Sequence, residues 1–198
     1  RGVLAGPAPD VETQHFLAGL NAGAVWIAPH HLPARLLEGK HGSHIRWFLF
    51  EKLDIGSTDL IRTVLSEKKV IKTVLEPSCG SCEYLTALQE RYDVHITGIE
   101  YNDTIFESII SLESNTLQLI HDDFLQYETS TTYDLIIGNP PYFVMKKKDV
   151  PESYYDYFEG RPNIFILFLI KSLHLLNENG ILSFVLPRNF LNCLYYDK

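Results

Sequence analysis

The sequence predicts an α/β protein with a Rossmann-like, doubly wound sheet. Short apolar segments such as Leu135-Ile136-Ile137 alternate with longer segments whose apolar residues repeat at helical spacing, which is typical of a parallel sheet. Several of the short segments end in small, acidic or proline residues, at the strand ends where open α/β sheets bind ligands. A length of 198 residues with 45% hydrophobic residues is enough for one domain with a full core.

Composition divides the chain near residue 44. Residues 1–44 are rich in Gly, Pro, Ala and His, and Lys40 is their only lysine. We expect an N-terminal arm of uncertain origin here, disordered apart from a short helix over residues 10–20. Its histidines lack the spacing of metal ligands, so no metal site is expected. Residues 45–198 are expected to form the folded domain.

The elements of this domain follow in chain order. Residues 45–69 are predicted to be helical, because Ser57-Thr58-Asp59 is a typical helix start and apolar residues follow it at helical spacing. Strands are predicted at 70–75, 94–99, 116–120, 133–137 and 181–186, the last one stopped by Pro187. Helices are predicted at 82–91, 102–112 and 163–176, the last one closed by Asn179-Gly180.

Charge and cysteine content narrow the class of protein. The net charge of −8 argues against a large basic surface but is compatible with a local basic groove. No apolar run approaches the ~20 residues of a membrane span, and no signal-peptide pattern is apparent. Three cysteines are too few for a disulfide scaffold, so we expect a cytoplasmic or nuclear protein that is neither secreted nor membrane-bound.

The segment Gly138-Asn139-Pro140-Pro141-Tyr142 ends the strand predicted at 133–137. Its prolines have no N–H to donate and hold the backbone extended. The Asn139 side-chain oxygen and the Pro140 carbonyl are therefore available acceptors, and Tyr142 adds an aromatic ring beside them. This set suits a planar base with an exocyclic amine. A proline-rich turn with a surface tyrosine is the simpler interpretation of the same residues.

Other strand ends carry polar groups of the same kind. The loop Glu76 to Cys82 has a single glycine, Gly80, so it is not the dinucleotide fingerprint, and Glu76 suits a cationic ligand group. Glu100 ends the next strand, where an acidic residue commonly binds ribose hydroxyls. Asp123 and Phe124 follow the third strand and offer a carboxylate and a ring for an adenine.

Taken together, Glu-Pro-Ser-Cys-Gly-Ser at 76–81, Glu100, Asp-Asp-Phe-Leu at 122–125 and Asn-Pro-Pro-Tyr at 139–142 resemble the S-adenosylmethionine-dependent amino-methyltransferases. The chain is most similar to the adenine-N6 DNA methyltransferases of restriction–modification systems, and the resemblance covers residues 57–198. It departs from the family pattern at Cys82, where a glycine is usual. Ser57-Thr58-Asp59 is at most an echo of the family's Tyr-Thr-Pro element.

The resemblance implies a class I methyltransferase domain over 45–198, with S-adenosylmethionine as cofactor and a flipped adenine in DNA as substrate. Asn139 and the Pro140 carbonyl would hold the amine for in-line attack, and Tyr142 would stack on the base. The implied catalytic residues are Asn139, Pro140, Pro141 and Tyr142. The implied cofactor-binding residues are Glu76, Ser78, Gly80, Glu100, Asp123, Phe124 and Asn139.

In this family about two more strands and a target-recognition region follow the strand predicted at 181–186. We therefore expect a C-terminally truncated fold, with the missing region in a longer enzyme or a partner subunit. We also expect the outer edge of that last strand to be exposed and apolar.

Alternatives remain open. Methyltransferases of RNA bases or protein glutamine amides use the same motif, and a catalytically silent binding module is a further interpretation. Cys79-Gly80-Ser81-Cys82 also matches the Cys-x-x-Cys of thiol oxidoreductases. Cytosine-C5 methylation is disfavoured, because Cys193 does not follow a proline. Residues Lys146 to Lys148 could meet phosphates or form a solvated loop. Residues 154–158 could cover the ligand or close the core.

Overall fold

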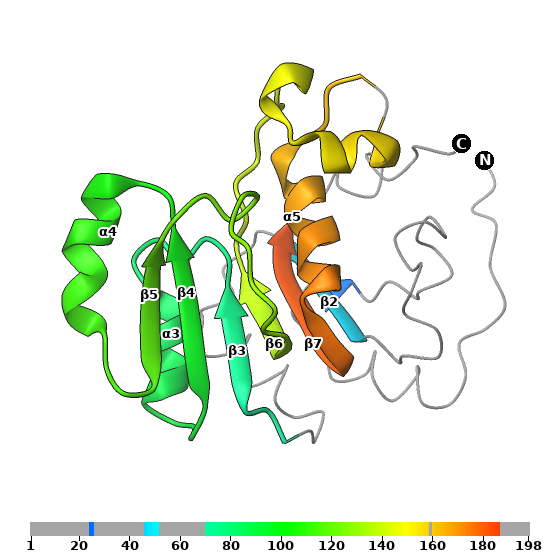
Figure 1. The fold of residues 1–198 in the computed structure, drawn as a ribbon. Coiled ribbons are helices and arrows are strands. Elements are labelled where there is room, and N and C mark those ends of the chain that lie inside the picture. Colours follow the sequence, from blue (N-terminus) through cyan, green and yellow to red (C-terminus); the bar gives the residue numbers. More distant parts are fainter. Residues whose placement is uncertain (1–23, 26–45, 52–69, 159, 187–198) are drawn as a thin grey trace, which may run out of the picture.

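The computed structural model describes residues 24–25, 46–51, 70–158 and 160–186, which form a seven-stranded sheet with helices (Figure 1). The strands are β1 (Ala24–Val25), β2 (Arg46–Glu51), β3 (Thr73–Glu76), β4 (His95–Glu100), β5 (Leu117–His121), β6 (Tyr133–Gly138) and β7 (Leu176–Leu186). The α-helices are α3 (Glu83–Gln89), α4 (Asp103–Ile109) and α5 (Ile164–His174). Short 3-10 helices are η3 (Ile110–Leu112), η4 (Lys147–Asp149) and η5 (Glu152–Tyr157).

The strand order is β1-β2-β7-β6-β3-β4-β5. All neighbouring strands are parallel except β1 and β2, which are antiparallel. The chain runs from β3 outward to β5 and then returns to β6 on the other side of β3. The direction of winding therefore reverses between β3 and β6, and the loops leaving such a switch point provide a ligand crevice. The predicted doubly wound α/β fold is confirmed.

The central strands are buried on both faces. Leu75 and Ile136 belong to the apolar cluster that includes α5, whereas Val74, Leu135 and Ile137 belong to the cluster that includes α3. This alternation along a strand is the two-residue period of a pleated sheet. One face of the sheet is thus covered by α5 and the other by α3.

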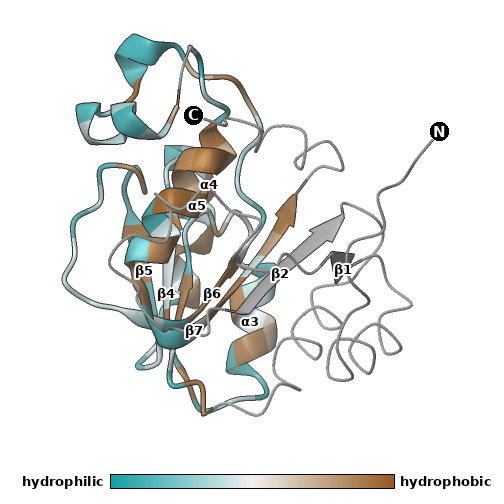
Figure 2. Cartoon of the chain, turned by 90° about the vertical axis from the view of Figure 1, so that its right-hand side faces the viewer, coloured by the Kyte–Doolittle hydropathy of each residue, from teal (hydrophilic) through white to brown (hydrophobic). Residues whose placement is uncertain are grey.

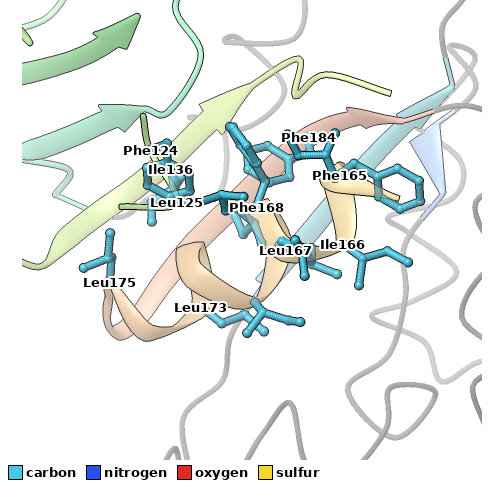
Figure 3. Close-up of a cluster of buried hydrophobic side chains, with 14 of the residues drawn as sticks. Phe124, Leu125, Ile136, Phe165, Ile166, Leu167, Phe168, Leu173, Leu175 and Phe184 are labelled. Atoms are coloured by element: carbon cyan, nitrogen blue, oxygen red, sulfur yellow. The ribbon is translucent and has the colours of Figure 1, made fainter. Parts of the chain in front are cut away.

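Helix α5 is apolar along most of its length, as its colour in Figure 2 shows. Asn163 begins the helix, and its side chain accepts a hydrogen bond from the Phe165 N–H at 3.4 Å. Residues 164–170 are all buried. Phe165 and Phe168 of α5 belong to the same cluster of buried apolar side chains as Ile136 and Phe184 of the sheet (Figure 3). A helix so apolar packs where it has no free face, which explains its place over the middle of the sheet.

Two expectations about the edge next to β7 are wrong. Arg46–Glu51, predicted to be helical, is the strand β2 and pairs in parallel with Ile181–Leu186. Its aromatic and branched residues suit a strand, and β7 supplies a ladder of partners that outweighs local helix propensity. The outer edge of β7 is consequently paired with β2 and is not exposed. The predicted helix start at 57–59 lies outside the described residues.

Strand β1 involves part of the predicted N-terminal arm, since Ala24 and Val25 pair with Phe50 and Leu49. The rest of that arm lies outside the described residues, so the boundary at residue 44 stays a prediction. At the other end, Asn179 and Gly180 lie inside β7 and do not close α5. Asn179 has a φ of 60°. Within the described part of the chain, no helix has the length and apolar character needed to cross a membrane.

Candidate active site

The loops after β3, β4, β5 and β6 meet at one edge of the sheet and are joined by hydrogen bonds. The Ser78 hydroxyl donates to the Asn139 carbonyl at 3.3 Å. The Gly80 N–H donates to Glu100 Oε2 at 2.9 Å. The Asp122 N–H donates to the Glu100 carbonyl at 3.2 Å. The structure therefore brings the four polar strand ends into one site, beside the switch point between β3 and β6.

The loop after β3 leaves space next to its backbone. Gly80 has a φ of 50°, and among the described residues, apart from Gly80 and its two chain neighbours, no atom lies within 4 Å of the position that a Cβ would take there. Cys82 has a φ of 62° in the left-handed region, which glycine adopts most readily. This conformation gives a physical reason for the glycine that the methyltransferase pattern has at the position of Cys82.

Both cysteines of this loop are free and buried, with exposed fractions of 4% for Cys79 and 0% for Cys82. The hydrogen bond from Cys79 lowers the pKa of Cys82, whereas the same bond and burial raise the pKa of Cys79. Thiol–disulfide exchange requires a thiolate that a partner can reach. The burial of both sulfur atoms therefore disfavours a thiol oxidoreductase.

Glu76, at the end of β3, is only 2% exposed. Its Oε2 has no hydrogen-bond partner among the described residues. Burial, followed by the charges of Cys82, Glu83 and Glu100, raises the pKa of Glu76 well above its usual range. A buried carboxylate without a partner is unfavourable. A cationic ligand group placed against Oε2 would remove that penalty.

Glu100 is held by backbone N–H groups on both of its carboxylate oxygens. Oε2 accepts from Gly80 at 2.9 Å and Oε1 from Asn102 at 2.7 Å. Each carboxylate oxygen has a second lone pair that can accept from another donor, such as a ligand hydroxyl. The structure thus gives Glu100 two roles: it orders the loop after β3, and it presents an oriented acceptor.

The residues after β5 make contacts within the protein. Asp123 accepts from the Leu125 N–H and from Gln126 Nε2, both at 2.9 Å. Phe124 is 1% exposed, and its ring centroid lies 4.9 Å from that of Phe168 at an angle of 51°. In this structure the Phe124 ring lies in the core under α5, and its contact with an adenine stays a prediction.

Two aromatic residues that sequence reasoning missed lie at the same edge. Tyr101 directly follows Glu100 and is 74% exposed, so it offers the free ring that Phe124 does not. Tyr84 is half-buried in the first turn of α3. Burial and the charges of Glu76 and Glu83 raise its pKa to about 12. Tyr101 could have been predicted from the sequence, because it is an aromatic residue next to an acidic strand end. No sequence pattern singled out Tyr84.

The Asn-Pro-Pro-Tyr segment has its own internal bonding. Asn139 is exposed, and the Tyr142 hydroxyl contacts both Asn139 Oδ1 and the Val185 carbonyl. A hydroxyl has one proton, so it can donate to only one of these oxygens at a time. The half-buried Tyr142 ring meets the Phe165 ring edge-on, with centroids 6.3 Å apart at 66°. The predicted stacking ring is thus anchored at its hydroxyl and supported by Phe165.

Neither a metal site nor a cavity marks this edge within the described residues. No group of three or more His, Cys, Asp or Glu side chains in the described part is placed to hold a metal ion. A cavity of about 580 Å³ lies beside residues 127–130, in the later part of the loop after β5, and the end of α5. Its lining residues do not include Glu76, Gly80, Glu100 or Asn139. The convergent polar groups, and not this cavity, mark the candidate site.

The chain is similar to known methyltransferases. The family model of the Eco57I restriction-modification methylases matches residues 25–198. Type II methyltransferase M.AccI of Acinetobacter calcoaceticus is 31% identical over 137 residues, which cover 64% of this chain and 25% of M.AccI. The tRNA1(Val) (adenine(37)-N6)-methyltransferase of Aliivibrio salmonicida is 30% identical over 124 residues, which cover 59% of this chain and 52% of the relative. The chain thus spans about a quarter of the length of M.AccI.

The fold also has counterparts among solved structures. A protein from Listeria monocytogenes, assigned to the class I S-adenosylmethionine-dependent methyltransferases, superposes with a TM-score of 0.54 at 21% identity. The superposition covers 79% of this chain and 52% of the Listeria protein.

Proposed function

Since this chain belongs to the Eco57I restriction-modification methylase family, we propose that it transfers the methyl group of S-adenosylmethionine to the N6 amine of adenine in DNA. The observation that carries the proposal is the position of Asn139-Pro140-Pro141-Tyr142 at the carboxyl end of β6. There it is joined to the loop after β3 through Ser78 and Asn139. The proposed acceptors for the amine and the proposed cofactor-binding loop after β3 therefore lie next to each other.

The residues at this edge fit S-adenosylmethionine. The Oε2 atom of Glu76, which has no hydrogen-bond partner within the described part of the chain, suits the ammonium of the methionine part. Gly80 leaves room for close approach to the backbone, and the free lone pairs of Glu100 suit ribose hydroxyls. We propose that Asp123 and the exposed ring of Tyr101 contact the edge and the face of the adenine. When bound, the cofactor supplies a methyl group made electrophilic by the sulfonium.

The chain's own residues position the base. The lone pair of an adenine amine is delocalised into the ring, which makes it a poor nucleophile. Asn139 Oδ1 and the Pro140 carbonyl accept its two N–H groups and draw the nitrogen toward a tetrahedral geometry. Asn139 Oδ1 is available for this when the Tyr142 hydroxyl donates to the Val185 carbonyl. Catalysis is then orientation and electrostatics, without a covalent enzyme intermediate.

A base in duplex DNA must leave the stack to reach these acceptors. Methylation at one defined sequence also requires side chains that read base edges in a groove. We propose that a target-recognition region or a partner subunit supplies this readout. The chain alone should therefore act on single-stranded DNA better than on a defined duplex site.

Methyl transfer from tritiated S-adenosylmethionine to single-stranded DNA, followed by nucleoside chromatography, tests this proposal. We expect label in N6-methyldeoxyadenosine, and loss of label with Asn139→Ala. Label in N4-methyldeoxycytidine would contradict the adenine assignment.

The second candidate is methylation of adenine in RNA, which the similarity to the tRNA1(Val) enzyme favours. Parallel reactions with an RNA of the same sequence and with a glutamine-containing peptide decide between the substrates. A rate on RNA well above that on DNA would show that RNA, and not DNA, is the substrate.

A further inference from the structure

We propose that Phe143, Val144 and Lys146 to Lys148, here called the 143–148 surface, bind the nucleic-acid strand beside the target base. Phe143 stacks on an unpaired neighbouring base, and the lysines meet the adjacent phosphates. This inference deepens the proposed function and rests on it for the identity of the partner. It assigns a role to side chains that neither the cofactor site nor the amine acceptors use.

The first observation is exposure beside the amine acceptors. Phe143 and Val144 directly follow Tyr142 and are 54% and 57% exposed. Within residues 70–158 and 160–186, Phe143 is the only phenylalanine that is largely exposed; Phe124, Phe165 and Phe168, for example, lie in the core. Two adjacent exposed apolar side chains that directly follow the proposed amine acceptors are placed to contact the strand that carries the target base.

The second observation is that the backbone holds this pair in place. The Ile164 N–H donates to the Phe143 carbonyl at 2.9 Å, and the Met145 N–H donates to the Pro162 carbonyl at 2.8 Å. Val144 forms an antiparallel bridge with Asn163. The segment is thus fastened to the start of α5. A ring on a fixed backbone loses little conformational freedom when a base stacks on it.

The third observation is the charge that follows. Lys146, Lys147 and Lys148 are all exposed, in a chain whose net charge is −8. The Lys147 amine lies 4.9 Å from the centroid of the Tyr155 ring, and the Tyr155 hydroxyl donates to the Lys147 carbonyl at 3.1 Å.

Asp149 and Glu152 flank the lysines and are also exposed, so the attraction for phosphates is confined to Lys146 to Lys148. Lysines alone would indicate only a solvated loop. An exposed aromatic ring followed by cations is typical of surfaces that bind single-stranded nucleic acids. The bases stack on the ring, and the phosphates contact the cations.

The test is the affinity of the full chain for a fluorescently labelled single-stranded DNA of about 12 nucleotides, measured by anisotropy. We expect Phe143→Ala to weaken binding about tenfold. Replacing the three lysines by glutamine should reduce the slope of log affinity against log salt by about 2. Ile110→Ala, a partly exposed apolar side chain on η3, is the matched control and should bind as the parent does.

Calorimetric titration with S-adenosylhomocysteine checks that each variant retains the cofactor site. If Phe143→Ala also loses cofactor affinity, Phe143→Leu decides, because leucine keeps the apolar volume and removes the stacking face. Wild-type affinity in Phe143→Leu, or no measurable DNA binding by the parent chain, would overturn the inference. DNA binding that follows the expected pattern without any methyl transfer would instead count against the proposed function alone.

Discussion

Glu76 couples the stability of this protein to pH. Its pKa is raised by burial, so the neutral acid is the form that the folded apo-protein tolerates. The contribution of Glu76 to the stability of the folded state is therefore fully present below its unfolded pKa near 4.5 and is lost as the pH rises through its raised folded pKa. A bound ammonium would reverse the preference, because it favours the carboxylate.

We predict that Glu76→Gln makes the apo-protein more stable at neutral pH and weakens cofactor binding. The melting temperature of the parent should fall, relative to that of Glu76→Gln, as the pH rises from about 5 to 8. Thermal unfolding of both proteins across this range measures the difference. Parallel melting curves at every pH would show that Glu76 does not titrate as its burial requires.

Tyr142 is the second residue with a specific prediction. Tyr142→Phe keeps the ring against Phe165 and removes the hydroxyl that contacts Asn139 Oδ1 and the Val185 carbonyl. It should retain much of the activity, whereas Tyr142→Ala should lose about 1–3 kcal/mol of base binding. The kcat/KM for methyl transfer to single-stranded DNA compares the two variants. Equal values for both would remove stacking by Tyr142 from the mechanism.

At the scale of elements, helix α5 fastens the chain that leaves β5. The Lys171 amine donates to the Leu125 carbonyl at 3.1 Å and to the Tyr127 carbonyl, and it lies 5.4 Å from the Phe124 ring centroid. Burial lowers the pKa of Lys171, and the charge of Asp123 opposes that shift. One side chain of α5 thus holds the loop on which Asp123 stands.

We predict that Lys171→Met lowers both the melting temperature and the affinity for S-adenosylhomocysteine. Two carbonyls would lose their donor, at a cost of about 1–3 kcal/mol. Lys171→Arg should restore most of both properties, and Lys148→Met, at an exposed position, should change neither. Calorimetric titration of the variants measures the effect. An unaltered affinity in Lys171→Met would separate this anchor from the cofactor site.

At the scale of the whole molecule, strands β1 and β2 complete one side of the sheet. Strand β7 carries buried residues such as Leu182 and Phe184 and pairs with β6 on one edge and β2 on the other. An unpaired edge of such a strand is a template for association with another chain. Strand β2 therefore protects the apolar centre of the sheet.

We predict that removal of residues 1–44, which takes away β1 and leaves β2, preserves the fold and the cofactor affinity. Removal of residues 1–51 takes away β2 as well and should produce self-association, since the edge of β7 is then open. Size-exclusion chromatography with light scattering compares the two truncations. A monomeric 52–198 chain with an unchanged melting temperature would contradict the protective role of β2.

The sequence by itself determined the strands β3 to β7, the helices α3, α4 and α5, and the parallel arrangement of these strands, but not the 3-10 helices η4 and η5. Apolar strands and amphipathic helices have periods that are visible along the chain, as in Leu135-Ile136-Ile137. The candidate site was predictable for the same local reason. Glycine, proline and acidic residues at strand ends can be recognised in short segments of the sequence. Parallel strands bring such ends to one edge of the sheet.

Only the tertiary structure decided that residues 46–51 form a strand, because their partner in β7 is far along the chain. It likewise decided that Phe124 lies in the core while Tyr101 is exposed, since burial depends on where α5 packs. The contact of the Tyr142 hydroxyl with the Val185 carbonyl joins residues 43 positions apart. Local sequence patterns carry no information on contacts between residues so far apart in the chain. These contacts are therefore known only from the tertiary structure.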